Sequence, residues 1–307
     1  MNLSNPIRQH WAALRALLVL TVILGMGYPM FIWLVAQIPG LSDKADGSII
    51  DLNGRPIASR LIGQQFTDGK GNALPQYFQS RPSLAGAGYD PMASGASNLG
   101  PENIVDTLGD PSKPAGDNGY SASLLTQVCI RSKDIGETNG VDGGRPFCTP
   151  GGVGAVLAVM GPRDARGTVA SPTRVISVNE PCSTTSRPFI AAYEGVRVEC
   201  ANFGEDYSAA QIVPIRGPAP SSPTVPADAV SASGSGLDPD ISPAYADLQV
   251  ARVAKARGVD AGEIGQLVTQ HSDDRAAGFF GEPTVNVVEL NLALDQKFPL
   301  KSSAQPG

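Results

Sequence analysis

The sequence predicts an α+β protein. A single N-terminal transmembrane helix is followed by an extracytoplasmic α+β domain, which a β-rich, disulfide-bonded insertion interrupts. Three observations support this prediction. One uncharged run near the N-terminus is long enough to span a bilayer, the last eighty residues contain repeated helix-capping signals, and four cysteines lie among short β-branched runs in the middle. The 307 residues are ample for a sizeable core.

The transmembrane helix is predicted from the first forty residues. Ala16 to Ala36 gives 21 consecutive uncharged, mostly apolar residues. At 1.5 Å per residue this is about 31 Å of helix, against roughly 30 Å for a hydrocarbon core. We expect an N-terminal segment over residues 1–15 and the helix over residues 16–38. A cleaved signal peptide is the alternative, but its apolar region would span about 7–15 residues, and Val35 to Pro39 is a poor cleavage site.

The charges beside this helix predict its orientation. Arg8 and Arg15 precede the helix, and the first acidic residue is Asp43. Because basic residues favour the cytoplasmic side, we expect a cytoplasmic N-terminus and a main domain outside the cell membrane. The chain is therefore predicted to be a single-pass membrane protein in contact with lipid.

Small residues in the second half of the helix predict a packing face. Gly25 and Gly27 bring the backbone close to the helix surface, next to Tyr28. Pro29 should kink the helix, which a membrane span tolerates when neighbouring groups satisfy the freed carbonyl. We expect these four residues to contact another helix.

The exported part begins with residues 39–115. Alternating runs on either side of Asn53-Gly54 predict a β-hairpin within residues 47–66, because this dipeptide favours a tight hairpin turn. Residues 67–120 are rich in Gly, Pro, Asn and Ser and are expected to be irregular.

Residues 116–226 are predicted to form a β-rich insertion. Four short runs between glycines and prolines are expected to be strands: Leu124–Ser132, Val153–Met160, Thr173–Asn179 and Phe189–Cys200. Residues 214–226 should be an extended, proline-rich connector. The cysteines are Cys129, Cys148, Cys182 and Cys200. Outside the cytoplasm two disulfides are expected, and of the three pairings 129–148 with 182–200 is the most local; four buried thiols are the alternative.

Residues 227–307 are predicted to be mainly helical. Ser242 before a proline, Asp260 and Asn286 are good N-caps, and Gly258 ends the first helix. The basic residues Arg252, Lys255 and Arg257 could form a binding patch, but cations that complement a helix C-terminus are the commoner case.

Charge and motif content argue against several function classes. The net charge is −6, and residues 43–307 carry 21 basic and 29 acidic residues, a balance of −8, which argues against nucleic-acid binding. No P-loop, G-x-G-x-x-G, H-E-x-x-H, EF-hand or G-x-S-x-G motif occurs. A hydrolase would need His271 as its base, whereas a solvated histidine at a polar helix end is the better interpretation. We expect no catalytic residue, bound cofactor or metal in this chain.

Two glycine-rich segments, residues 93–101 and 231–239, predict close approach of backbone to a neighbour. They are interpreted either as tight turns within the domain or as a shaped docking surface. The candidate interface residues in these segments are Ser94, Asn98, Leu99, Gly100, Ser235, Gly236, Leu237 and Asp238.

The chain resembles the C subunit of Kdp-type potassium-transporting P-type ATPases. The resemblance rests on blocks in the same order, at residues 47–66, 77–83, 93–101, 231–258 and 278–295 (GFFGEPTVNVVELNLALD), and on Gly27-Tyr28-Pro29 in the N-terminal span. The run Ser-Gly-Leu-Asp-Pro-x-Ile-Ser-Pro at 235–243 is highly specific. The chain departs from the family between Gly116 and Pro226, where most members have a much shorter link, and resembles the actinobacterial form there.

The resemblance implies a non-catalytic subunit of an ATP-driven, high-affinity potassium uptake pump. It would anchor and stabilise, from the outer side, the assembly of a channel-like potassium-translocating subunit and a P-type ATPase subunit. ATP, Mg and potassium would be handled by those partners. The acidic outer domain would either raise local potassium concentration or, as the commoner case, keep the domain soluble. The competing interpretation is an independent membrane-anchored binding module or hydrolase of the cell envelope.

Overall fold

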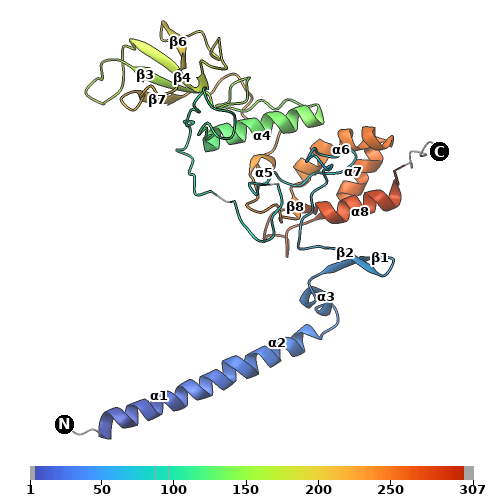
Figure 1. The fold of residues 1–307 in the computed structure, drawn as a ribbon. Coiled ribbons are helices and arrows are strands. Elements are labelled where there is room, and N and C mark those ends of the chain that lie inside the picture. The colour runs from blue at the N-terminus through green and yellow to red at the C-terminus, as the bar shows by residue number, and fades with distance from the viewer. Residues whose placement is uncertain (1–3, 87, 96, 301–307) are drawn as a thin grey trace. The chain divides into compact units, whose positions relative to one another are not determined.

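The computed structural model describes residues 4–86, 88–95 and 97–300, and its mixed α+β architecture confirms the predicted fold class (Figure 1). The chain divides into two compact units with the boundary between Ile62 and Gly63. The first unit holds the N-terminal helix and a hairpin, and the second holds everything that follows.

The N-terminal helix consists of α1 (Ser4–Val22), the π-helical turn η1 (Ile23–Gly27) and α2 (Tyr28–Ala36). Within it, the 30 residues Ile7–Ala36 are long and apolar enough to cross a membrane. Pro29, expected to kink the helix, lies in the first turn of α2 directly after the π turn, in which the N–H of Tyr28 bonds the carbonyl of Ile23. π turns occur mostly as single turns inside α-helices, and they are, with proline, among the recognised causes of a helix kink.

The rest of the first unit is α3 (Ser42–Ala45) and an antiparallel hairpin of β1 (Ile49–Leu52) and β2 (Arg55–Ser59). The hairpin confirms the prediction around Asn53-Gly54, and both turn residues have positive φ, 53° and 75°. Its pairing ends at Ser59, well before the end of the run that predicted it.

Helix α4 (Leu124–Asn139) corrects the prediction of a strand over Leu124–Ser132. The hydroxyl of Ser123 caps it by accepting from the N–H of Thr126, and Gly140 ends it in the left-handed conformation. Its fully buried face consists of Thr126, Cys129, Ser132 and Gly136. These residues have helical spacing but are small or polar. The sequence therefore shows no hydrophobic periodicity typical of a helix in this stretch.

The insertion contains a five-stranded sheet in the order β5-β6-β4-β3-β7. Its strands are β3 (Val156–Met160), β4 (Arg174–Pro181), β5 (Ala192–Tyr193), β6 (Val196–Ala201) and β7 (Gln211–Pro214). Strand β6 runs parallel to β4, and the other pairs are antiparallel. The runs predicted at 153–160 and 173–179 are confirmed, the run at 189–200 forms β5 and β6, and β7 was not predicted.

Both disulfides follow the most local pairing. Cys129 of α4 bonds Cys148, with 5.5 Å between the Cα atoms, and Cys182 after β4 bonds Cys200 of β6, with 5.0 Å. The first disulfide fastens the loop before β3 to α4, and the second fastens the end of β4 to its parallel neighbour.

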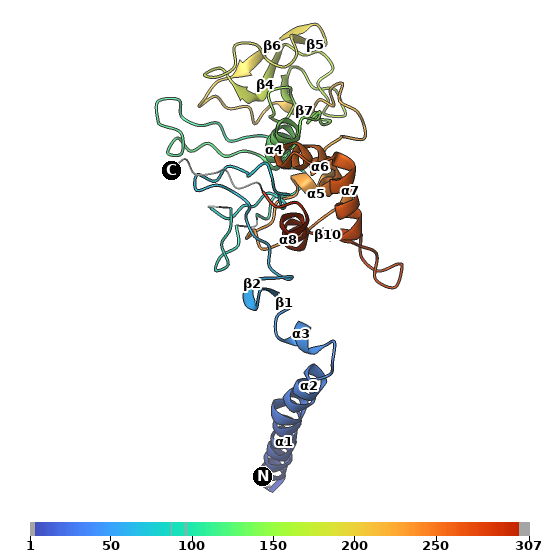
Figure 2. The same cartoon turned by 90° about the vertical axis from the view of Figure 1, so that its right-hand side faces the viewer.

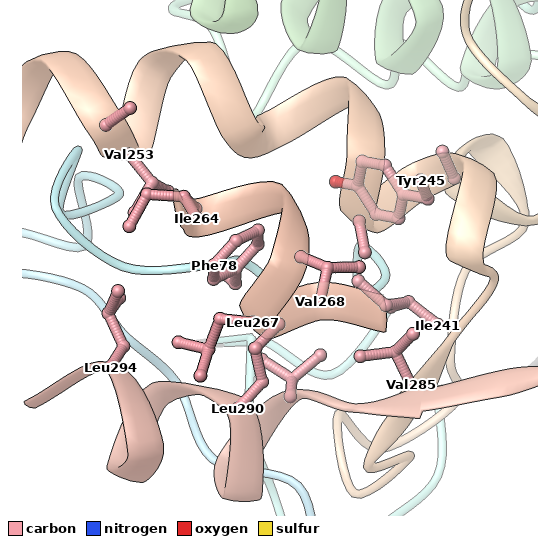
Figure 3. Close-up of a cluster of buried hydrophobic side chains, with 14 of the residues drawn as sticks. Phe78, Ile241, Tyr245, Val253, Ile264, Leu267, Val268, Val285, Leu290 and Leu294 are labelled. Carbon is pink, nitrogen blue, oxygen red and sulfur yellow. The ribbon is translucent and has the colours of Figure 1, made fainter. Parts of the chain in front are cut away.

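The C-terminal region forms the main core with helices α5 (Ala227–Val230), α6 (Pro243–Arg257), α7 (Ala261–Gln270) and α8 (Val287–Lys297). A small antiparallel sheet, not predicted, pairs β10 (Thr284–Asn286) with β8 (Asp240–Ile241) and β9 (Ser272–Asp273). The predicted caps Ser242, Asp260 and Asn286 each accept a backbone N–H. Figure 3 shows that Phe78, from the irregular segment, lies among the side chains of these helices, and it is fully buried.

Candidate functional site

The glycine-rich segment at 231–239 lies against residues 82–95, the stretch that leads into the other glycine-rich segment. The N–H of Leu84 donates to the carbonyl of Ser233 (2.9 Å), and the N–H of Ser233 donates to the carbonyl of Pro82 (2.7 Å). Further along, the N–H of Asp90 donates to the carbonyl of Ser235 (2.8 Å). Backbone hydrogen bonds therefore join chain segments separated by about 150 residues in sequence.

Glycine is required where these segments touch. Gly236 has φ +80°, and a Cβ there would lie 2.2 Å from the carbonyl oxygen of Gly88. A Cβ at Gly95 would lie 2.4 Å from the carbonyl oxygen of Leu84, and the N–H of Gly95 bonds the carbonyl of Gly234 at 2.6 Å. The close backbone approach that the sequence predicted is therefore made inside the domain. Gly236 approaches Gly88, which precedes the segment at 93–101, and the bond from Gly95 to Gly234 joins the two glycine-rich segments directly.

An ion pair completes this junction. A guanidinium nitrogen of Arg81 lies 2.7 Å from a carboxylate oxygen of Asp238. Hydrogen bonds from the Ser233 hydroxyl and from Arg81 hold the pKa of Asp238 below its usual value, although partial burial opposes the shift. The carbonyl of the adjacent Leu237 accepts the N–H of buried Gly63 at 2.8 Å. Asp238 thus fixes a loop and is in no arrangement suited to general acid or base chemistry.

The candidate interface residues differ in exposure. Ser94, Asn98 and Leu99 are exposed, whereas Gly100 and the run Ser235 to Asp238 are half-buried. Leu99, at 38% exposure, is the one large apolar side chain among the exposed three. The part of the site that remains open to a partner is therefore Ser94 and the outer edge at residues 97–99.

The small-residue turn of the N-terminal helix is uncovered. A Cβ on Gly25 would come no closer than 4.0 Å to Thr21, and one on Gly27 no closer than 3.8 Å to Val22, both in the same helix. Tyr28 is 59% exposed. Within the first unit this face, which includes Pro29, is free for another helix or lipid.

Lys255 and Arg257 lie in the last turn of α6, as expected of cations at a helix C-terminus, and Arg252 and Arg257 also bind other parts of the chain. Arg252 donates to the carbonyls of Pro75 (2.7 Å) and Tyr77 (2.9 Å). Arg257, whose side chain is 1% exposed, donates to the carbonyl of Gln76 (2.8 Å) and pairs with Asp295 (2.7 Å). These two arginines hold residues 75–77 of the irregular segment against the helices. The sequence does not reveal this role, because the acceptors are backbone carbonyls far away in the chain.

The described residues contain no group of three or more His, Cys, Asp or Glu side chains that could hold a metal ion. His271 caps the end of α7, with Nδ1 2.9 Å from the carbonyl oxygen of Leu267. A cavity of about 560 Å³ beside the Cys129–Cys148 disulfide is lined by α4 and by loop residues, and its Lys133 is paired with Glu137. None of these features brings together a nucleophile, a base and an oxyanion donor.

One exposed feature was not predicted as a site. Phe279 and Phe280 are 66% and 63% exposed, and their ring centroids lie 4.2 Å apart. The sequence signal was two adjacent phenylalanines enclosed by glycines outside any predicted core pattern.

A family model described as "K+-transporting ATPase, c chain" matches residues 10–107 and 185–296, which include the N-terminal helix and both glycine-rich segments. The chain belongs to the KdpC family. The resemblance found in the sequence is thereby confirmed.

Curated KdpC subunits align along nearly the whole chain. Proteins named potassium-transporting ATPase KdpC subunit are 34% identical in Kineococcus radiotolerans (97% of this chain, 99% of the relative) and 35% identical in Gemmatimonas aurantiaca (92% of both). The Mycobacterium tuberculosis protein of the same name is 32% identical (94% of this chain, 98% of the relative). The KdpC family match leaves out residues 108–184, where α4, β3 and β4 lie, yet these relatives have similar length.

Proposed function

We propose that this KdpC chain is a non-catalytic subunit of an ATP-driven potassium uptake pump. It anchors itself by one transmembrane helix and stabilises, from the outer side, the assembly of the potassium-translocating and ATP-hydrolysing subunits. The observation that carries the proposal is the family match across both units of a chain whose described residues form no catalytic or metal-binding constellation.

The N-terminal helix supports a role in assembly. Its apolar side chains are exposed from Ile7 to Leu34, and it has no packing partner within the described part of its own unit. Helices associate in lipid where small residues let backbones approach, and Gly25 and Gly27 occur at the π turn. Arg8 and Arg15 before the helix and Asp43 after it favour a cytoplasmic N-terminus.

The second unit supports the outer location. Two disulfides persist in oxidising compartments and are rare in the cytoplasm. An outer location also separates the unit from cytoplasmic ATP, which agrees with the missing nucleotide motif.

The assembly role is tested by purifying the full-length tagged chain from its own membranes in mild detergent. We expect a multi-span subunit and a P-type ATPase to copurify. A Gly25→Leu/Gly27→Leu variant should lose most of both partners, whereas Val19→Leu, an exposed position on the same helix, should retain them. Recovery of the wild-type chain alone would contradict the proposal and favour an independent envelope protein.

The orientation is tested with a membrane-impermeant thiol reagent on intact cells. The four native cysteines are bonded, so single introduced thiols report location. We expect Ser186→Cys, exposed in the second unit, to be labelled at once and Gln9→Cys only after permeabilisation. The reverse pattern would place the domain in the cytoplasm.

A further inference from the structure

The loop between β9 and β10, residues 274–283, is closed by contacts within itself. Ala276 and Phe280 exchange two backbone hydrogen bonds of 2.9 Å each, and the side chains of Arg275 and Glu282 form an ion pair at its base. Ala277 has φ +55°, an uncommon conformation for a residue with a side chain. Figure 2 shows the chain between α7 and β10 projecting from the helices beside it.

Two phenylalanines occupy the end of this loop and are exposed together. Their rings contact each other, and neither belongs to the hydrophobic clusters of the second unit. The other exposed phenylalanines of this unit, Phe147 and Phe203, make no ring–ring contact with a described residue. A loop that holds a pair of large apolar side chains together in water is typical of a surface that a partner covers.

The charge around the pair discriminates between a protein and a lipid partner. Asp273, Asp274 and Glu282 flank it, and the single basic residue, Arg275, is already paired with Glu282. Loops and helices that insert into a membrane surface carry lysine or arginine, which anionic head groups attract. An acidic rim around two aromatic anchors instead fits an apolar pocket with a basic rim on another protein.

We propose that residues 273–282 are a docking loop whose Phe279 and Phe280 insert together into an apolar, basic-rimmed pocket on the outer surface of another subunit of the pump. This proposal rests on the proposed function, because it assigns one contact of that assembly. Both rings would be buried on docking, and the ordered loop would lose little conformational freedom.

The test is photo-crosslinking in native membranes with the full-length chain. A benzophenone amino acid at position 279 or 280 should give an adduct with another protein subunit. The same group at Phe203, which is 50% exposed, is the control and should not. Adducts with lipid alone, adducts with a second copy of this chain, or no adduct would each overturn the proposal.

A second measurement separates docking from folding. Phe279→Ser/Phe280→Ser should reduce copurified partner subunits by roughly tenfold without changing the thermal midpoint of the isolated chain, and Phe203→Ser should leave copurification unchanged. If wild-type copurification succeeds while the double variant binds as well as wild type, the docking loop is wrong and the proposed function stands. A crosslink to a protein outside any ATPase complex would overturn the proposed partner of the loop and, if no pump subunit copurifies with the wild-type chain, the proposed function as well.

Discussion

Asn291 of α8 satisfies both backbone polar groups of Phe78. The N–H of Phe78 donates to Oδ1 of Asn291, and Nδ2 of Asn291 donates to the carbonyl of Phe78, both at 2.9 Å. Gln249 of α6 does the same for the next residue, Gln79, at 2.7 and 3.0 Å. Two buried amides from two helices thus replace the neighbouring strands that an extended segment would otherwise need.

Replacement of Asn291 by Leu should destabilise the second unit strongly. The buried N–H and carbonyl of Phe78 would lose their partners, and each unsatisfied group costs about 1–3 kcal/mol. We expect a loss of about 3 kcal/mol in urea unfolding of the detergent-solubilised chain. Gln270→Leu, at the exposed end of α7, is the control and should change little. Equal stability of the two variants would show that the amide contributes nothing.

Substitution of Gly236 should destabilise the second unit, because the backbone of Gly236 lies directly against that of Gly88. Gly204 has nearly the same φ, +81°, but a Cβ there would meet no atom within 4 Å, so Gly204→Ala should cost about 1 kcal/mol for backbone conformation alone. Gly236→Ala adds a clash with the backbone and should cost about 2 kcal/mol more. Thermal midpoints of both variants measure the difference. Similar midpoints would mean that the backbone at residue 236 moves away from Gly88 at no cost in stability.

The contact between Gly236 and Gly88 complicates the interpretation of interface variants at position 236. Loss of the complex in a Gly236→Val variant would report a broken domain as readily as a lost contact. Leu99 and Asn98 lie at the exposed edge and are the better positions for testing docking by these segments.

The disulfides should contribute unequally to stability. Each closes a loop of similar length, 19 and 18 residues apart, for which chain entropy predicts about 3 kcal/mol. Cys129 is 1% exposed on the buried face of α4, whereas Cys182 is exposed. Cys129→Ala/Cys148→Ala should therefore lower the thermal midpoint more than Cys182→Ala/Cys200→Ala. The opposite order would mean that the sheet, and not α4, limits stability.

The sequence predicted those elements whose conformation depends on residues close to each other in the chain. The hairpin follows from Asn53-Gly54 and the C-terminal helices from their caps at Ser242, Asp260 and Asn286. Helix α4 was misread because its buried face is made of small and polar residues, such as Ser132. Strands of two residues, such as β8, carry too few side chains to form a pattern.

The site was predicted less completely than the fold. Close backbone approach at Gly236 followed from the glycines, but its target, Gly88, lies in a distant segment with no complementary pattern. The roles of Arg252 and Gln249 depend on bonds to backbone groups, which every residue possesses and no sequence reveals. Phe279 and Phe280 matched the family run, yet only the structure shows them exposed.

A charged cluster at one end of the sheet predicts how stability changes with pH. Arg174 of β4 binds Glu199 of β6 at 2.9 Å and also binds Glu205 in the loop after β6. The hydrogen bond from Arg174, with smaller contributions from Asn202 and Tyr207, lowers the pKa of Glu205 from 4.5 to about 2. The cluster therefore ties the loop to two parallel strands as long as Glu205 is ionised.

Because its pKa is lower in the folded chain, Glu205 stabilises the fold fully above pH 4.5, and this contribution is lost as the pH falls towards about 2. Glu205→Gln should lower the thermal midpoint by a constant amount between pH 5 and 8, and the difference from wild type should shrink between about pH 4.5 and 2. Glu194→Gln, on the exposed turn between β5 and β6, controls for the loss of one negative charge. The effect should weaken in high salt, because the side chain of Glu205 is 29% exposed. A difference that stays constant down to pH 2 would show that the Arg174 contact does not depend on the charge of Glu205.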